Sequence, residues 1–452
     1  MRRLTCLLGM LLLVSSAGGQ ERLRLHGSNT IGEALAPAMV ERWLRAEGYD
    51  QIQRREIAFE EIELIGRAGS SELVVEIHAH GSSTGFVDVA AGRADIAMSS
   101  RPVRASDRAL SQAVAGLDRA EQEIVLAMDG LALIVHPSNP LRGLSKGQIR
   151  QIFSGQLSDW SQLSADMRGR IRVHARDDRS GTYDSFRAMV LGDADVLEGA
   201  LRYESTEKLA QAVAADPLAI GFVGLSGVRG VRALEVSDGA QALAPSVENV
   251  AVEDYPLSRR LYLYAPEPRS PIADRFLRFA VSDQAQPLVE SVGLVSQAIR
   301  RYQPRLRQDA PEEYHRLVKQ AERLSLNLRF GTGMSVLDGK NVRDLDRLER
   351  FMQQPEQRGR SLILLGFSDA NETLPIMALR ISGDRADFVA QLLVQRGIDP
   401  ARVRGLGGAA PVASNDNDLG RQRNRRVEVW LGQAAPGVAS RITSRTASKA
   451  AP

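Results

Sequence analysis

Short apolar runs that alternate with helical patterns constrain the fold of this chain more than any other feature. Three runs, "LALIVHP" at 131–137, "RIRVHAR" at 170–176 and "LAIGFVGL" at 218–225, have the length and apolar content of strands. Stretches with helical periodicity separate such runs between about Glu21 and Leu225. This alternation is typical of layered α/β structures and excludes a helical bundle or a β-sandwich.

The length of 452 residues predicts more than one domain. A main unit is expected over 21–300 and a second, smaller α/β unit over 326–432. The charged stretch 301–325 between them is expected to be a linker with a helical part. The tail 433–452 is rich in Ala, Ser, Pro and Gly, a composition that predicts disorder.

The first twenty residues have the pattern of a cleaved secretory signal. They combine a basic start, an apolar run over 4–14 and then small residues. The only cysteine, Cys6, lies inside this segment, so the exported chain is expected to have neither a disulfide nor a thiolate metal site. Removing Arg2 and Arg3 lowers the net charge from +3 to +1. So small a charge argues against nucleic acid as a partner.

Three turns rich in glycine and hydroxyl residues each lead into a helical pattern. They are "HGSNT" from His26, "HGSST" from His80 and "RDDRSGT" from Arg176. Helix starts offer free backbone N–H groups, hydroxyls add donors, and an arginine fork matches a tetrahedral oxyanion. Any one of these turns is more simply explained as a helix cap. Three of the same character indicate a shared anion.

Several motifs in this part of the chain resemble the phosphate-binding proteins of bacterial ABC transporters. They are "GSSTGF…GRADIAMSSRPV", "LSKGQIRQIFSGQLSDWSQL", "RDDRSGTYDSF" and "AIGFVGLS", in the family's order. The resemblance covers about 21–300. It implies a two-lobed periplasmic-binding-protein fold with hinge strands near 131–136 and 259–265, and one phosphate in the cleft. The phosphate-binding residues that it implies are Ser28, Thr30, Ser82, Ser83, Arg101, Arg176, Ser180, Gly181 and Thr182.

One departure from that family affects the choice of anion. Well-known members carry an aspartate after the "DIxxS" run, where it accepts a proton from phosphate and repels sulfate. Here Ser100 and Arg101 follow "DIAMS". Phosphate and sulfate therefore both remain open, and Asp177 or Asp178 could supply the missing acceptor.

The C-terminal unit is similar to the OmpA-like peptidoglycan-binding domain. The motifs that carry the similarity are "GFSD", "ISGDRADFV" and "RNRRVEV". The resemblance implies that Asp369 binds the ammonium group of diaminopimelate and Arg385 its carboxylate. It places three further residues at or behind the site: Asn424, Arg425 and Arg426. Ala378 stands where the family has asparagine, and the loop 369–375 is altered, so both reshape the expected site.

A second cluster raises the question of a metal. Glu76, His78 and His80 share one face of an expected strand by alternation, and such groups can hold a metal ion. A stable site needs about four ligands, and no other residue completes this one in the sequence. We therefore expect plain hydrogen bonding, with neither a metal nor a cofactor.

Together these features predict an exported, non-enzymatic protein that binds inorganic phosphate, or a similar oxyanion, and anchors to peptidoglycan. No nucleophile stands beside a base at a telling spacing, which argues against an enzyme. The periplasm is the expected location, with an outer-membrane association and a partner permease of an ABC transporter left open. The alternative is a structural envelope protein whose anion site is a relic or has been repurposed.

Overall fold

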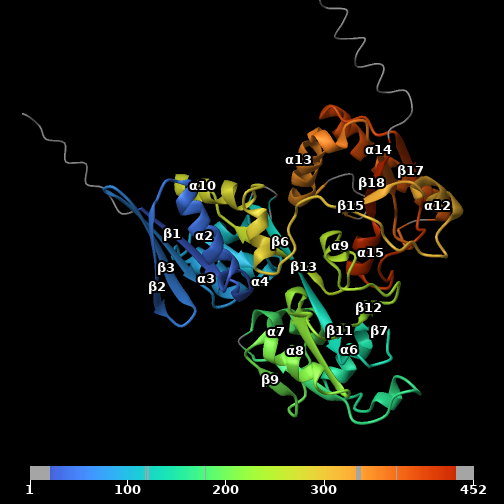
Figure 1. Cartoon of the computed structure of the whole chain (residues 1–452). Coiled ribbons are helices and arrows are strands. Elements are labelled where there is room, and N and C mark those ends of the chain that lie inside the picture. Colours follow the sequence, from blue (N-terminus) through green and yellow to red (C-terminus); the bar gives the residue numbers. More distant parts are fainter. Residues whose placement is uncertain are drawn as a thin grey trace, which may run out of the picture.

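The computed structural model describes residues 21–117, 119, 122–178, 180–331, 337–372 and 374–433 (Figure 1). The predicted signal segment lies outside this range, as does the predicted disordered tail beyond residue 433. Within the described ranges, every helix is too short or too polar to cross a membrane. The chain forms two lobes and a third unit, with an α/β composition throughout, as predicted.

The first lobe is a sheet with helices on both faces. Its strands follow the order β2-β3-β4-β1-β5-β13. The core side chains of α2 and α10 pack on one face, and α3 packs beside β1 and β5. The strands are β1 (Glu21–Gly27), β2 (Gln51–Ala58), β3 (Glu61–Ala68), β4 (Ser71–His78), β5 (Ile96–Ser99) and β13 (Ser258–Tyr264). The helices are α1 (Asn29–Gly32), α2 (Leu35–Ala46), α3 (Ser82–Ala90), α4 (Ala105–Arg108), α5 (Gln112–Ala115), α10 (Pro271–Ala280) and α11 (Gln286–Ser291).

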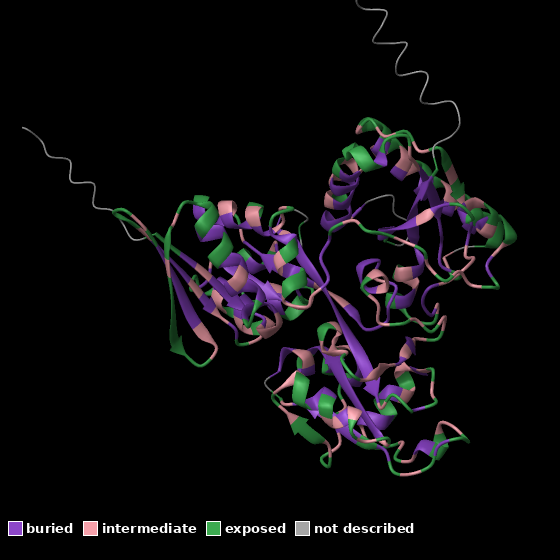
Figure 2. Ribbon diagram, viewed as in Figure 1, coloured by how far each residue is buried: buried purple, intermediate pink, exposed green. Residues whose placement is uncertain are grey.

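A single long strand, β6 (Glu123–Val135), passes from the first lobe into the second. Its first half pairs antiparallel with β13, and its second half pairs with the strand β10 of the second lobe. Twelve of its thirteen residues are buried, and the strand is purple through the centre of Figure 2. The two crossing strands therefore include 131–136 and 259–265 in part, but β6 begins eight residues earlier than expected.

The second lobe surrounds the far half of β6. Strands β10 and β8 continue the sheet to β9, and β11 pairs with β6 from the other side. The elements are β7 (Gly143–Ser145), β8 (Arg172–Arg176), β9 (Leu201–Tyr203), β10 (Ala219–Gly224), β11 (Arg232–Ala233), β12 (Glu235–Ser237), α6 (Lys146–Phe153), α7 (Gly181–Phe186), α8 (Thr206–Ala214) and α9 (Val247–Ala251).

The third unit is a five-stranded sheet in the order β14-β15-β18-β16-β17. Helices α13 and α14 bury leucines on one face, and α12 packs Tyr314 on the other, against Phe367 and Trp430. The elements are β14 (Arg301–Tyr302), β15 (Glu322–Arg329), β16 (Ser361–Gly366), β17 (Arg402–Gly405), β18 (Arg426–Gly432), α12 (Glu312–Val318), α13 (Gly339–Gln353), α14 (Pro375–Gln395) and α15 (Asp418–Asn424).

The stretch 301–325, which was expected to be a linker with a helical part, also contributes strands to the third sheet. It contains α12, and also β14 and the start of β15, which pair with each other at the edge of the third sheet. The hydroxyl of Tyr314 on α12 lies 3.0 Å from a buried carboxylate oxygen of Glu428 in β18. Charged residues dominate this stretch because it crosses the surface, but its apolar side chains complete the core of the third unit.

Polar contacts join the third unit to the two lobes. On β13, Arg260 donates to Glu253 at 2.9 Å and to Asp338 of the third unit at 2.6 Å. Arg329 of β15 donates to Asp254 at 2.8 Å. Burial alone would raise the pKa of Glu253, but the charges of Arg260, Lys340 and Arg329 lower it below its usual range. The third unit is therefore docked on the hinge region by buried ion pairs.

Candidate functional site

The first and third hydroxyl turns meet across the two lobes. Thr30 lies in α1 of the first lobe, and Gly181 begins α7 of the second. A Cβ atom added to Gly181 would lie 2.6 Å from the Thr30 hydroxyl oxygen and 2.8 Å from its backbone nitrogen. Carbon atoms do not approach these groups so closely, so only glycine permits this contact. The lobes are closed on each other at this point.

An arginine on the hinge strand lies at the junction. Arg259 donates to the Thr30 hydroxyl at 2.8 Å, to the Gly181 carbonyl at 3.4 Å and to a carboxylate oxygen of Asp129 at 3.1 Å. Burial lowers the pKa of the guanidinium, and the charges of Asp129 and Asp184 oppose that shift. Arg259 was not among the residues predicted from the sequence. The signal for it was a charged residue at the start of an expected hinge strand.

The hydroxyl of Ser28 is buried without a hydrogen-bond partner among the described residues. The residue is 1% exposed, and its amide donates to the Met98 carbonyl at 2.9 Å. A buried hydroxyl with no partner costs free energy, so a ligand oxygen or a water molecule at this position would satisfy it.

The second turn lies beside the first. The amide of Gly81 donates to the Gly27 carbonyl at 2.7 Å. Ser82 accepts a hydrogen bond from the Ser100 amide at 3.0 Å, and Ser83 accepts one from Arg101 at 3.0 Å. Both hydroxyl oxygens therefore already have donors within the protein, and the Ser82 hydroxyl also lies 3.3 Å from the Ser100 hydroxyl.

Arg101 does not contribute a free positive charge. Its two terminal nitrogens donate to the two carboxylate oxygens of Asp107, at 2.6 and 3.0 Å. Burial would raise the pKa of Asp107, but the hydrogen bonds from Arg101 and from the Arg104 amide lower it. The pair is neutral overall, and anion binding by Arg101 stays a prediction.

The remaining residues of the third turn have mainly local partners. The Ser180 hydroxyl accepts from the Thr182 amide at 3.2 Å, which is the capping role considered above. Arg176 donates to the Glu204 carbonyl at 2.8 Å and to the Thr206 hydroxyl at 2.6 Å.

Arg176 nevertheless faces the first lobe. Burial lowers the pKa of its guanidinium, while the charges of Asp177 and Glu33 raise it. Glu33 immediately follows α1, so its electrostatic effect on Arg176 acts from the opposite lobe. Each terminal nitrogen of the guanidinium carries a second N–H group beyond those already used.

Two carboxylates flank Arg259, and neither was predicted. Asp129 pairs with it on β6, and Asp184 lies in the first turn of α7. The surrounding protein raises the pKa of Asp184, although its side chain is exposed, and the charges of Arg259 and Arg187 oppose the shift. Of the acceptors expected from the sequence, Asp178 is paired with Arg202 at 2.8 Å instead.

In the third unit, Asp369 and Arg385 are both buried and both have internal partners. Asp369 accepts from Arg425 at 2.8 Å and from the Asn371 amide at 2.9 Å. Arg385 holds both carboxylate oxygens of Glu372, one of them at 2.8 Å. Glu372 belongs to the altered loop 369–375, and its side chain is 2% exposed. A carboxylate of this chain thus occupies the guanidinium fork.

The other predicted residues of this unit form its framework. The Asn424 side chain accepts from the Val412 and Ala413 amides at 2.9 and 3.0 Å and so holds the preceding loop. Arg426 donates to Glu428 at 2.7 Å, within the core beside Phe367. The charged end of Asp369 and the fork of Arg385 are therefore the parts suited to a zwitterionic ligand.

Comparison with known proteins matches two regions of the chain. A PBP superfamily domain matches residues 67–284, and the OmpA family matches residues 329–425. The phosphate-binding protein PstS of Pseudomonas aeruginosa is 28% identical over 246 residues, which cover 49% of this chain and 73% of its own length. The PstS protein of Bacillus subtilis is 28% identical over 213 residues, covering 47% and 67%.

Solved structures match the same region. The crystal structure of an ABC-type phosphate transport receptor from Vibrio cholerae has a TM-score of 0.49 and 24% identity, and the match covers 60% of this chain and 99% of the receptor. Both resemblances identified from sequence motifs are confirmed by the domain matches. By these matches the chain carries a PBP superfamily domain followed by a domain of the OmpA family, and its first part is similar to PstS proteins.

Proposed function

We propose that this protein binds inorganic phosphate between its two lobes and attaches to peptidoglycan through its third unit. The observation that carries the first part is the junction of Thr30, Gly181 and Arg259. It brings a hydroxyl of the first lobe, a backbone group of the second lobe and a guanidinium of the hinge to one place. The PstS relatives are named for phosphate binding, which favours phosphate over other anions.

Closure around the anion would supply donors from every side. Ser28 offers a buried hydroxyl without a partner, Thr30 and Thr182 offer hydroxyls from opposite lobes, and Arg259 offers its positive charge. Donors from two lobes can meet the anion together only when the cleft is closed, so ligand binding favours the closed state. Arg101 acts through Ser83 in this arrangement, not as a direct ligand.

Discrimination between phosphate and sulfate requires an acceptor for the phosphate proton. Asp184 and Asp129 both lie within the field of Arg259, and burial raises the pKa of Asp184. We propose one of these two carboxylates for the role that an aspartate after "DIxxS" has in related proteins. A fully ionised sulfate would have no proton to share with it.

The test is calorimetric titration of the full chain with phosphate and with sulfate from pH 5 to 9. Phosphate is expected to bind and sulfate to be excluded. Replacing Arg259 with methionine, together with Asp129→Asn to avoid an unpaired buried carboxylate, should weaken binding roughly 10- to 150-fold, since a hydrogen bond to a charged group contributes about 1.5–3 kcal/mol. Arg54→Met, on the exposed strand β2, is the matched control. Equal binding of both anions would refute phosphate selectivity, and no binding would favour a structural role.

Attachment to the cell wall requires a change at Arg385. The carboxylate of diaminopimelate can reach the guanidinium fork only by displacing Glu372, which occupies it in this structure. Asp369 must likewise exchange part of its pairing with Arg425 for the ligand ammonium. We propose that the loop 369–375 weakens wall binding for this reason but leaves the recognition chemistry in place.

Sedimentation with purified peptidoglycan tests this step. Glu372→Gln removes the internal carboxylate charge and should increase the bound fraction, with an affinity at least about tenfold higher, because a buried arginine without a counter-charge gains several kcal/mol from a new partner. Glu356→Gln, an exposed carboxylate of the same unit, is the control and should have no effect. Unchanged or weaker sedimentation of Glu372→Gln would show that Glu372 does not compete with the ligand.

We further propose that the protein works in the periplasm, where both ligands are present. A permease partner would require an exposed surface on the two lobes. Release of phosphate to reconstituted transporter membranes tests that partnership.

A further inference from the structure

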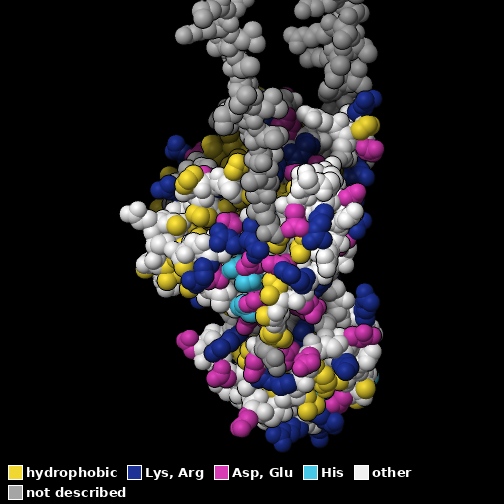
Figure 3. Space-filling view, turned by 90° about the vertical axis from the view of Figure 1, so that its left-hand side faces the viewer, with side chains coloured by type: hydrophobic (Ala, Val, Ile, Leu, Met, Phe, Trp, Pro, Cys, Tyr) yellow, Lys and Arg dark blue, Asp and Glu magenta, His cyan; other side chains and the backbone are white. Residues whose placement is uncertain are grey.

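The outer face of the first lobe carries histidines and carboxylates that the anion cleft does not use. His26 of β1 and His78 of β4 are register partners on neighbouring parallel strands, and their rings stack with centroids 4.0 Å apart. Glu76 lies on the same face, two residues before His78. Figure 3 shows histidine side chains gathered at the surface of this lobe among acidic and basic ones.

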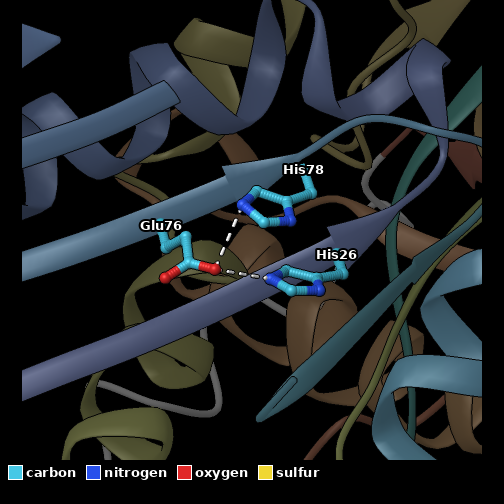
Figure 4. Close-up of side chains that lie close together, drawn as sticks. All are labelled: His26, Glu76 and His78. Atoms are coloured by element: carbon cyan, nitrogen blue, oxygen red, sulfur yellow. Dashed lines mark hydrogen bonds and ion pairs between the residues drawn. The ribbon is translucent and has the colours of Figure 1, made fainter. Parts of the chain in front are cut away.

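The ligating atoms of these three residues converge. One Glu76 carboxylate oxygen lies 3.2 Å from His26 Nε2 and 3.1 Å from His78 Nε2, as Figure 4 shows. A tetrahedral zinc ion with bonds of about 2.1 Å separates its ligand atoms by about 3.4 Å. Among the described residues, this is the group in which three such atoms lie within 4.8 Å of one another. We propose that His26, Glu76 and His78 form a binding site for a divalent transition metal, with zinc the best match.

The surroundings orient these atoms for a metal. Asp88 lies 2.8 Å from His26 Nδ1, so a neutral His26 that donates from Nδ1 to this carboxylate has its lone pair on Nε2. Arg22 donates to the second oxygen of Glu76 at 2.8 Å and fixes that side chain. A carboxylate behind a ligating histidine is the usual support of zinc sites. With no cation between them, the Nε2 lone pair of His26 would face a carboxylate oxygen.

The local charge also favours a dication. Five carboxylates in this region outnumber the three arginines paired with them: Glu60, Glu61, Glu63, Glu76 and Asp88 against Arg22, Arg55 and Arg93.

Glu61 of β3 lies near this group and would need to move toward it to serve as a fourth ligand. Glu61 pairs in register with His78, and one of its oxygens lies 3.7 Å from His78 Nε2, while the other accepts from His80 at 2.9 Å. The sequence pattern grouped His80 with Glu76 and His78, but the fold brings His26 into the cluster and leaves His80 to support Glu61. Binding requires the two stacked rings to tilt, because a ligating lone pair lies in the plane of its ring.

The test uses the full chain after treatment with a chelator, in phosphate-free buffer, titrated with Zn²⁺ by calorimetry. One ion per chain is expected. His78→Ala and Glu76→Gln should each weaken binding at least about 100-fold, and Asp88→Asn about 10-fold, the range found when support for a zinc ligand is lost. His136→Ala in the second lobe is the control. His26 is left unchanged because its backbone leads directly to Ser28.

Wild-type protein that binds no zinc would overturn the proposal, as would His78→Ala and Glu76→Gln variants that bind like wild type. Circular dichroism and phosphate titration establish that each variant is folded. The absorption spectrum of Co²⁺ added to the unmutated chain gives a second readout without any substitution. Intense visible bands indicate the expected tetrahedral site, and the weak bands of a hydrated octahedral ion contradict it.

Discussion

Replacing Gly181 with alanine should separate closure of the lobes from the chemistry of the anion site. The new methyl group would lie 2.6 Å from the Thr30 hydroxyl and 2.8 Å from the Thr30 backbone nitrogen. The hydroxyl can rotate away, but the backbone nitrogen cannot, so the two lobes would have to move apart by several tenths of an ångström or more. The substitution removes no hydrogen-bonding group of the cleft.

The magnitude follows from the cost of overpacking, about 1–3 kcal/mol. If the closed state loses that much, the phosphate dissociation constant rises roughly 5- to 150-fold, since each 1.4 kcal/mol is a factor of ten. Calorimetry measures the constant, and Gly224→Ala is the control because a Cβ atom there meets nothing within 4 Å. A Gly181→Ala variant that binds phosphate as tightly as wild type would refute the inference that the ligand is held by closed lobes.

Three further predictions concern stability. Ser28→Ala should raise the free energy of unfolding of the ligand-free chain by about 1 kcal/mol, because it removes a buried hydroxyl without a partner. The same substitution should weaken phosphate binding. Thermal melting with and without phosphate measures both effects, and a destabilised ligand-free variant would contradict the expected gain in stability. Burial opposes ionisation of Glu428, but nearby arginines lower its pKa from 4.5 to about 2. The contribution of Glu428 to stability is therefore full above about pH 4.5 and is lost as the pH falls toward 2. A melting temperature of the third unit that stays constant over this range would exclude this contribution. Arg260→Met should leave Glu253 without one of its counter-charges and cost about 3–5 kcal/mol, with chemical denaturation as the assay and a loss under 1 kcal/mol as the contrary result.

The elements of the fold were predictable because they depend on local patterns. The apolar runs that contain β8 and β10 and overlap β6 and β13 are visible as strands, and the two domain families follow from short motifs with a fixed order. Turns with hydroxyl groups were also recognisable, since capping and anion binding use the same residues.

The partners of charged side chains were not predictable in the same way. Arg259 bonds with Thr30 across 229 positions of sequence, and no local pattern encodes that contact. Arg101 had the expected position in its motif, but its guanidinium group forms an ion pair with Asp107, six residues later. The choice among several nearby carboxylates depends on distances of a few tenths of an ångström, which only the packed structure determines.

The extended backbone of β13 turns successive side chains to opposite faces. Arg259 reaches Thr30 of the first lobe, while its neighbour Arg260 reaches Asp338 of the third unit. A rotation of this strand when the lobes open or close would therefore also move Arg260 and its contact with Asp338 of the third unit. If the third unit attaches to peptidoglycan as proposed, this strand would couple the state of the anion site to the attached unit, together with the other ion pairs that join the third unit to the hinge.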